Sequence, residues 1–272
     1  MSRIVTVSAS SQVKAEDAGC VVVSGSYGGQ YNAWHAGKWG LRGVVLNDAG
    51  VGRNDAGIDG LPYLDTIGLP AATADVMSCH IADGDHMLAH GVVSHVNAAA
   101  AALGCTVGDS VRACVDRMLA APPVSGELPP IAGGRRYTLD DGNGRRKLVA
   151  LDAAPLLQPD DAGAIAVTGS HAALFRGKPD GVVSADVYAI FFNDAGVGLD
   201  GAGIARLPTL DERGIIAGAV DCNSAPIGNA RAIYADGVLS HVNETAARHG
   251  AKPGMALKAF IDMLQAEGGK GA

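Results

Sequence analysis

Short apolar runs recur along the chain and are separated by polar turns rich in glycine. A run of about four to eight apolar residues between turn residues is typical of a strand that is covered on both faces, as in a parallel sheet. Short helices are predicted at residues 30–41 and at 62–67, where Pro62 suits the first helical position. We predict strands at residues 4–7, 19–23, 43–46, 69–74, 148–151, 163–167 and 189–192.

Longer stretches with helical periodicity close each half of the chain. Apolar side chains between residues 91 and 103 fall on one face at about 100° per residue, which predicts a helix. Residues 237–243 repeat the beginning of this pattern, and further helices are predicted at 109–119 and 255–264. Because strands alternate with helices, the pattern indicates an α/β fold with a mainly parallel sheet in each half.

One hexapeptide occurs twice and divides the chain. Asn-Asp-Ala-Gly-Val-Gly stands at residues 47–52 and again at 193–198, each time after an apolar run. We therefore predict a tandem duplication of one α/β module, with the repeats at residues 1–121 and 145–272 related by a pseudo-twofold axis. The Pro- and Gly-rich joint at residues 122–144 is expected to contribute a hairpin strand that pairs with residues 148–151.

Composition and charge exclude several classes of partner. The net charge is −7 and basic residues do not cluster beyond residues 145–147, so we expect no nucleic-acid partner. No apolar stretch approaches the roughly 18 residues of a membrane span, and we expect no membrane partner. Five cysteines, an odd number without CxxC spacing, favour reduced thiols. Since the N-terminal segment also lacks a signal-peptide pattern, a cytoplasmic location is expected.

The repeated turns are the first candidates for chemistry. Loops at the carboxyl ends of parallel strands form the crevice where α/β proteins usually bind ligands. Asp48 or Asp194 is a candidate general base, while Asn47, Asn193 and the amide of Gly50 are candidate ligand contacts. The alternative interpretation is an Asx turn whose side chains bind only local N–H groups.

A second candidate is the turn at residues 24–29, Ser-Gly-Ser-Tyr-Gly-Gly. Ser26 is a candidate nucleophile, although its surroundings do not match a nucleophile elbow. Gly25, Tyr27, Gly28 and Gly29 are candidate substrate contacts because glycine amides cradle anions. A glycine turn that only clears space for a helix is the alternative.

The matching turn of the second half reads Thr-Gly-Ser-His-Ala-Ala at residues 168–173. Ser170 and His171 are candidate substrate contacts there. If the two halves face each other, one pocket would combine the Gly28-Gly29 cradle with acid/base groups from across the interface. His95 is a candidate catalytic imidazole, with His241 at the matching position. Arg231 is a candidate partner for a substrate carboxylate.

Two weaker patterns concern cofactors. Asp83, His86 and His90 are candidate metal ligands, because His86 and His90 would share one helix face, but solvated histidines are the favoured interpretation. Residues 196–201 form a literal GxGxxG sequence after a strand. Asp194 would place a carboxylate near the pyrophosphate there, so a nicotinamide site is only an alternative. We expect neither a metal nor a cofactor.

These features favour a cofactor-independent hydrolase that acts on a small polar carboxylic acid or amide at the strand-end glycine loops between the repeats. A non-catalytic protein that binds a small anionic ligand is one alternative, and an NAD-linked oxidoreductase is another. The expected partner is a small-molecule substrate, and whether the chain forms a homo-oligomer is left open.

Overall fold

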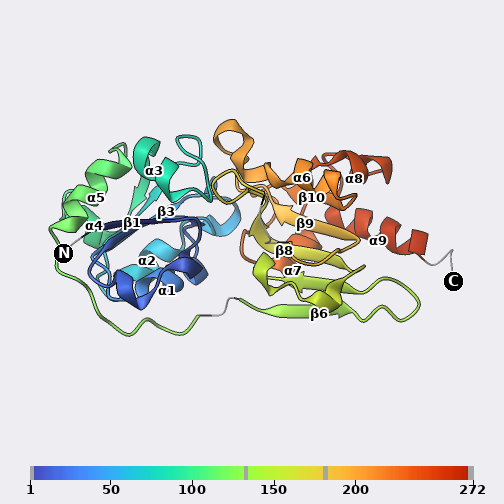
Figure 1. The fold of residues 1–272 in the computed structure, drawn as a ribbon, viewed down its shortest axis with the longest axis horizontal. Helices are drawn as coiled ribbons and strands as arrows, with labels where there is room; N and C mark the ends of the chain where they lie inside the picture. Colours follow the sequence, from blue (N-terminus) through green and yellow to red (C-terminus); the bar gives the residue numbers. More distant parts are fainter. Residues whose placement is uncertain (1–2, 132–133, 180–182, 269–272) are drawn as a thin grey trace.

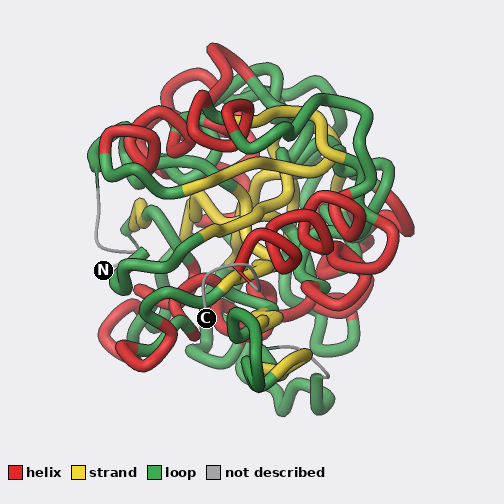
Figure 2. Tube along the Cα trace, turned by 90° about the vertical axis from the view of Figure 1, so that its right-hand side faces the viewer, coloured by secondary structure: helices red, strands yellow, loops and turns green. Residues whose placement is uncertain are grey.

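The computed structural model describes residues 3–131, 134–179 and 183–268. It contains two sheets that lie side by side along the long axis of the molecule (Figure 1). Helices lie on both sides of the strands, which occupy the interior in the perpendicular view of Figure 2. The predicted α/β class with mainly parallel sheets is therefore confirmed.

The first sheet has five strands in the order in which they follow in the chain. Its first four strands run parallel, and the fifth pairs antiparallel with the fourth. The strands are β1 (Ile4–Val7), β2 (Val21–Tyr27), β3 (Gly43–Asn47), β4 (Ala71–Ala74) and β5 (Val93–Val96).

The second sheet repeats this order and adds one strand at its edge. Strands β7 to β10 are parallel, β11 is antiparallel to β10, and β6 from the joint pairs antiparallel with β7, which confirms the predicted hairpin. The strands are β6 (Arg136–Asp140), β7 (Leu148–Leu151), β8 (Ile165–His171), β9 (Ala189–Asn193), β10 (Ile216–Val220) and β11 (Leu239–Val242).

Helices cover both faces of each sheet because successive strand residues point to opposite faces. In the first half, α1 and α2 pack with Val22 and Val44, while α3 and α5 pack with Val23 and Val45. The helices of this half are α1 (Gln30–Gly37), α2 (Gly60–Asp65), α3 (Gly84–His90), α4 (Ala98–Ala102) and α5 (Val111–Leu119).

The second half differs on one face. Helices α7 and α9 pack with Phe191 on one side of the sheet, whereas α6 shares the other side with apolar side chains from residues 183–187. That segment lies in the connection from β8 to β9, where the first half has helix α1 between β2 and β3. The helices are α6 (Arg206–Glu212), α7 (Ala230–Asp236), α8 (Glu244–Arg248) and α9 (Leu257–Gly268).

The helix predicted at residues 91–103 is wrong. Residues 93–96 form the edge strand β5 instead, and the helix begins only at Ala98. The open edge of β4 offers backbone groups that need partners, and pairing with β5 satisfies them. Asn97 then starts α4, because its side-chain oxygen accepts from the N–H groups of Ala100 and Ala71. The prediction for residues 237–243 fails in the same way, with β11 and α8.

The two halves meet at the repeated hexapeptide turns. Gly50 and Gly196 lie so close that a Cβ on either would come within 2.9 Å of the other's Cα. Backbone bonds cross the same contact, from Arg53 N–H to Cys222 O (2.8 Å) and from Leu199 N–H to Val76 O (2.9 Å). Apolar side chains from both halves surround the turns and bury this junction. The carboxyl ends of both sheets therefore face each other.

Candidate functional site

The repeated turns adopt an unusual left-handed path. Residues 49–52 and 195–198 all have φ between 48° and 74°, including Val51 at 63° and Val197 at 64°. A β-branched residue rarely takes this conformation, which costs roughly 1–2 kcal/mol per residue for L-amino acids. Because both turns pack against the opposite half, the contact between the halves holds this strained path in place.

The aspartates of these turns act as hydrogen-bond acceptors within the junction. Asp48 Oδ1 accepts from the N–H groups of Gly50 and Val76, both at 3.0 Å. Asp194 Oδ1 accepts in the same way from Gly196 and Cys222, and its Oδ2 accepts from the Ser240 hydroxyl at 2.7 Å.

Burial raises the pKa of Asp48, and the two N–H donors oppose that change. The asparagines of the turns are also fully buried. Asn47 and Asn193 each accept from the N–H group two residues later, at 2.9 Å. This pattern is that of an Asx turn, so these four side chains support the turn backbone from within.

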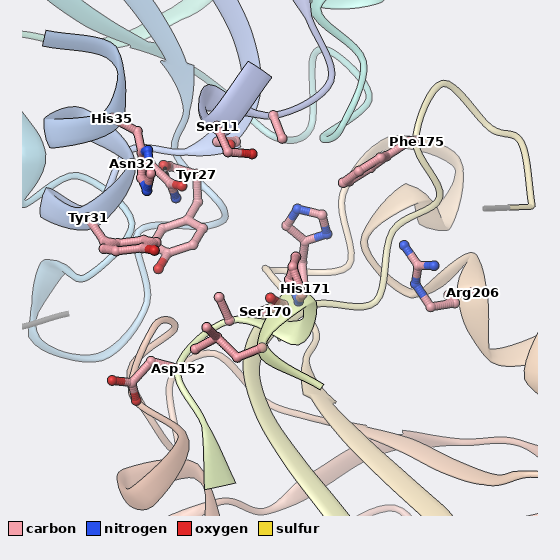
Figure 3. A pocket seen from close by; sticks show the side chains of 15 residues that line it. Ser11, Tyr27, Tyr31, Asn32, His35, Asp152, Ser170, His171, Phe175 and Arg206 are labelled. Atoms are coloured by element: carbon pink, nitrogen blue, oxygen red, sulfur yellow. Dashed lines mark hydrogen bonds between the residues drawn. The ribbon is translucent and has the colours of Figure 1, made fainter. Parts of the chain in front are cut away.

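Between the ends of β2 and β8 lies a cavity of about 170 Å³, which we call the interhalf cavity (Figure 3). Four of the predicted site residues line it together: Ser26 and Tyr27 from β2, and Ser170 and His171 from β8. The rings of Tyr27 and His171 stand on facing sides in Figure 3. The remaining lining residues are Ala9, Ser11, Tyr31, Asn32, His35, Asp152, Ala153, Pro155, Leu156, Phe175 and Arg206.

Tyr27 and His171 occupy equivalent positions. Tyr27 pairs in register with Asn47 of the neighbouring strand, and His171 pairs in register with Asn193. Burial raises the pKa of the Tyr27 phenol, and the charges of Asp59 and Asp152 raise it further, so this hydroxyl stays protonated. His171 Nδ1 accepts from Ala173 N–H at 3.2 Å. This bond favours the neutral imidazole with its proton on Nε2.

The two serines also make equivalent contacts. Ser26 Oγ accepts from Ser10 N–H, and Ser170 Oγ accepts from Ala154 N–H, both at 2.9 Å. Each bond ties a strand end to the short 3₁₀ helix that follows β1 or β7. No contact of the Ser26 hydroxyl with a histidine is found among the described residues. The hydroxyl oxygens thus anchor the cavity wall.

Three further residues that the sequence analysis missed contribute titratable groups. Tyr31 and His35 lie four residues apart on α1, which places both on the face toward the cavity, with their rings 4.7 Å apart. Burial, and then the charge of Lys38, lower the pKa of His35. Asp152 follows β7 and accepts from the N–H groups of Arg135 and Ala230. The i, i+4 spacing of Tyr31 and His35 was the available signal.

The predicted glycine contacts serve the chain's own packing. Gly28 donates its N–H to Asn47 O at 2.8 Å, and a Cβ there would lie 2.6 Å from Gly57 O. A Cβ on Gly29 would meet the Tyr27 ring, and one on Gly25 would meet the backbone at Ala82. None of these three glycines has a positive φ. They allow chain segments to approach closely around the cavity.

Other predicted residues lie outside the lining of this cavity. His95 and His241 sit on the edge strands β5 and β11, and each ring contacts the serine that precedes it. Arg231 is exposed on α7, with its guanidinium 4.4 Å from the centre of the Tyr137 ring. The structure therefore does not place Asp48, Asp194, His95 or Arg231 beside Ser26 among the residues that line the interhalf cavity.

The predicted histidine cluster forms a stack. The rings of His80 and His86 lie 3.9 Å apart and nearly parallel, and His90 follows at 4.5 Å. Asp83 caps α3, since its Oδ1 accepts from the N–H groups of Asp85 and His86. The predicted ligands Asp83, His86 and His90 do not form a group among the described residues whose ligand atoms all lie within 4.8 Å of one another.

His80 also bonds Asp200 of the second half, through Nε2 and Oδ2 at 3.0 Å. A more compact group of potential ligand atoms is formed by Asp194, Asp221 and Cys222, all within 4.8 Å of one another. Burial raises the pKa of the Cys222 thiol to about 12. Because the Asp194 carboxylate already accepts three hydrogen bonds, we do not assign a metal site there.

The GxGxxG sequence folds into the junction between the halves. A Cβ on Gly198 would lie 2.7 Å from the side chain of Val76, and the Leu199 N–H is bonded to Val76 O. The N–H groups of Gly196 and Gly198 are bonded within the turn. A pyrophosphate needs free N–H groups and open space at such a turn, and neither is present at these positions.

Comparison with protein families, with curated proteins and with solved structures finds no match for this chain. No helix among the described residues is long and apolar enough to span a bilayer.

Proposed function

We propose that the interhalf cavity binds a small polar substrate and that the chain is an acid–base enzyme of the hydrolase class. The observation that carries this proposal is the position of Tyr27 and His171. They end equivalent strands of the two halves and line one cavity. Convergent titratable groups in a cavity at the carboxyl ends of parallel strands are typical of α/β active sites.

Two hydrogen-bond donors suit the substrate carbonyl oxygen. The protonated Tyr27 phenol is one, and the neutral His171 imidazole with its proton on Nε2 is the other. Donors of this kind stabilise the negative charge that develops on a carbonyl oxygen during attack. This role fits the raised pKa of Tyr27, because a buried phenol that keeps its proton remains a donor across the neutral range.

His35 is the proposed general base. Its lowered pKa keeps the imidazole neutral near pH 7 and able to accept a proton from water. The water oxygen then bonds to the carbonyl carbon, and His35 returns the proton to the leaving amine or alcohol as the carbon–heteroatom bond breaks. Ser26 and Ser170 shape the cavity wall in this scheme, and no covalent intermediate on serine is required.

A screen of small amides, esters and carboxylates by thermal shift, followed by turnover assays, tests this proposal. We expect Tyr27→Phe and His171→Gln each to lower turnover by about a hundredfold or more, with the melting temperature nearly unchanged. His95→Gln and His241→Gln are matched controls on strands outside the cavity and should keep turnover within about twofold. Ligand-induced stabilisation without turnover would instead identify a binding protein and contradict the enzymatic proposal.

A further inference from the structure

A second cavity, of about 290 Å³, shares Tyr27 and Tyr31 with the interhalf cavity. Its other walls come from both halves, chiefly the start of α1, the loop after β3 that carries Asp59, and residues 226–229. We call it the Asp59 cavity. Gly228 has a φ of 84°, and a Cβ there would lie 2.4 Å from the Tyr27 hydroxyl oxygen. Glycine at this position therefore lets the tyrosine reach the second half.

Asp59 is the charged side chain among the described residues that line this cavity. Its Oδ1 accepts from Gln30 N–H at 2.8 Å. Its pKa is raised to about 6, mainly by burial; the hydrogen bond from Gln30 N–H opposes this rise, and the neighbouring acidic charge of Asp55 adds to it. No basic side chain in the described part of the chain lines this cavity or acts on Asp59, and a partly buried carboxylate without a counter-charge is unfavourable.

The local fold does not require this charge. Ala205 stands at the equivalent position of the second half, and the same turn forms there before α6. The contact with Gln30 N–H needs only a hydrogen-bond acceptor, which a neutral Asn or Ser supplies equally well. Neither the formation of the turn nor the hydrogen bond at the start of α1 therefore requires the negative charge of Asp59.

The electrostatic field in this region favours a cation. Asp59 lines one of the two cavities and Asp152 the other, and both charges raise the pKa of the Tyr27 phenol after the effect of burial. The shared walls are two tyrosine rings, and aromatic rings attract cations through their quadrupole. A positive group in the Asp59 cavity would therefore gain from a carboxylate and from aromatic neighbours together.

We propose that the Asp59 cavity is a binding site for a primary ammonium group, with the Asp59 carboxylate as its counter-ion. An ammonium needs few acceptors, whereas Mg²⁺ and Ca²⁺ require about six or more oxygen ligands and commonly more than one carboxylate. The site goes beyond the proposed acid–base chemistry and does not depend on it. If both hold, the shared tyrosines place an amine-bearing portion of the substrate next to the reacting carbonyl.

The test is an NMR titration of the isotopically labelled protein with n-propylammonium chloride. We expect saturable shifts of the Gln30 and Gly228 amide signals, and no such shifts with n-propanol or with sodium chloride at the same ionic strength. Asp59→Asn should weaken propylammonium binding by at least about tenfold, as expected for the loss of a charge-assisted bond. Asp55→Asn removes an equal charge from the same loop outside the cavity lining and should change the affinity by less than about twofold.

A second measurement needs no variant. The Gln30 amide signal of the unaltered protein should report the titration of Asp59, and propylammonium should lower its pH midpoint by binding the ionised carboxylate. Asp55 is the other carboxyl group beside it, Tyr27 and Tyr31 keep their protons in this range, and residues 226–229 contain no titratable side chain. An unmoved Gln30 signal, unchanged affinity in Asp59→Asn, or tighter binding of Mg²⁺ at the same amide would overturn the proposal.

Discussion

The ends of β2 and β8 share a scaffold and differ in what they present. At both ends a serine hydroxyl accepts from the N–H group of a 3₁₀ helix that precedes the strand in the chain, and the residue after the serine pairs with the asparagine of a hexapeptide turn. That next residue is Tyr27 in one half and His171 in the other. The scaffold is therefore common to both halves, and the chemistry lies in the positions where they diverge.

The chain that follows each strand end differs as well. After β2, helix α1 brings Tyr31 and His35 to the cavity. The described residues between β8 and β9 form no such helix; instead Phe175 lines the cavity, and the buried Arg206 donates to Ala173 O at 2.5 Å. One half thus supplies two titratable rings from a helix, and the other supplies a bulky aromatic wall. Identical turns hold these unlike parts against each other.

The largest effects on stability are expected at the turn aspartates. Asp48→Ala and Asp194→Ala each leave one buried and one partly buried N–H group without an acceptor, which should lower the free energy of unfolding by about 3 kcal/mol. Chemical denaturation of both variants measures this. Asp48→Asn and Asp194→Asn keep an acceptor oxygen and should lose clearly less stability. A large loss of turnover with unchanged stability in either Asn variant would instead indicate a direct catalytic role.

A smaller effect is the difference in stability lost on substitution at Gly28 and at Ala172, which occupy equivalent positions. A Cβ at Gly28 would press on Gly57 O and the Thr73 methyl group at 2.6 and 2.7 Å, so Gly28→Ala should destabilise the fold by about 2 kcal/mol. Ala172→Gly, its counterpart, removes one buried methyl group and should cost about 1 kcal/mol. Denaturant titrations compare the two variants. Equal costs would contradict the asymmetric packing described for the two strand ends.

The smallest effect is a dependence of stability on pH at Asp59. Its pKa is about 6 in the folded state and ordinary in the unfolded chain, so the folded state holds the proton more tightly. The contribution of this group is therefore greatest below about pH 4 and is lost as pH rises through 6. Between about pH 4.5 and 7.5 the free energy of unfolding of the unaltered protein should fall by about 1 kcal/mol more than that of Asp59→Asn. This value is reduced for solvent screening.

Melting curves of the unaltered protein and of Asp59→Asn at both pH values measure this difference. The Asn side chain keeps an acceptor for Gln30 N–H, so the comparison isolates the charge. Ala205→Asp is a control that introduces the equivalent carboxylate into the second half. If the melting temperatures of the unaltered protein and of Asp59→Asn change in parallel with pH, Asp59 is not the group responsible.

Much of the fold could be predicted from the sequence because short apolar runs and repeated turns reflect local requirements. The strands before the hexapeptide turns and the hairpin of the joint are examples. The edge strands β5 and β11 could not be predicted in this way. Residues 92–103 have apolar side chains at helical spacing, but residues 93–96 form a strand because they pair with the open edge of β4. That edge exists only once the sheet has formed.

The candidate site could be predicted only where it depends on matched turns. Comparing residues 24–29 with 168–173 identified Tyr27 and His171 as a contrasting pair. The sequence could not separate them from Asp48 and Asp194, because an Asx turn and a general base look alike without burial and donor contacts. Asp59 and Asp152 depend on contacts between distant segments, such as that of Asp152 with Ala230 N–H, and no local pattern indicates them.

The central claim is that the ends of β2 and β8 form one site, and a double-mutant cycle tests it most directly. Turnover of Tyr27→Phe, His171→Gln and the double variant is measured on the best substrate found in the screen. If both donors act on one carbonyl oxygen, the double variant should lose clearly less than the product of the two single losses, because residues acting as a unit are not additive. Fully multiplicative losses, or single variants that retain normal turnover, would contradict a shared site.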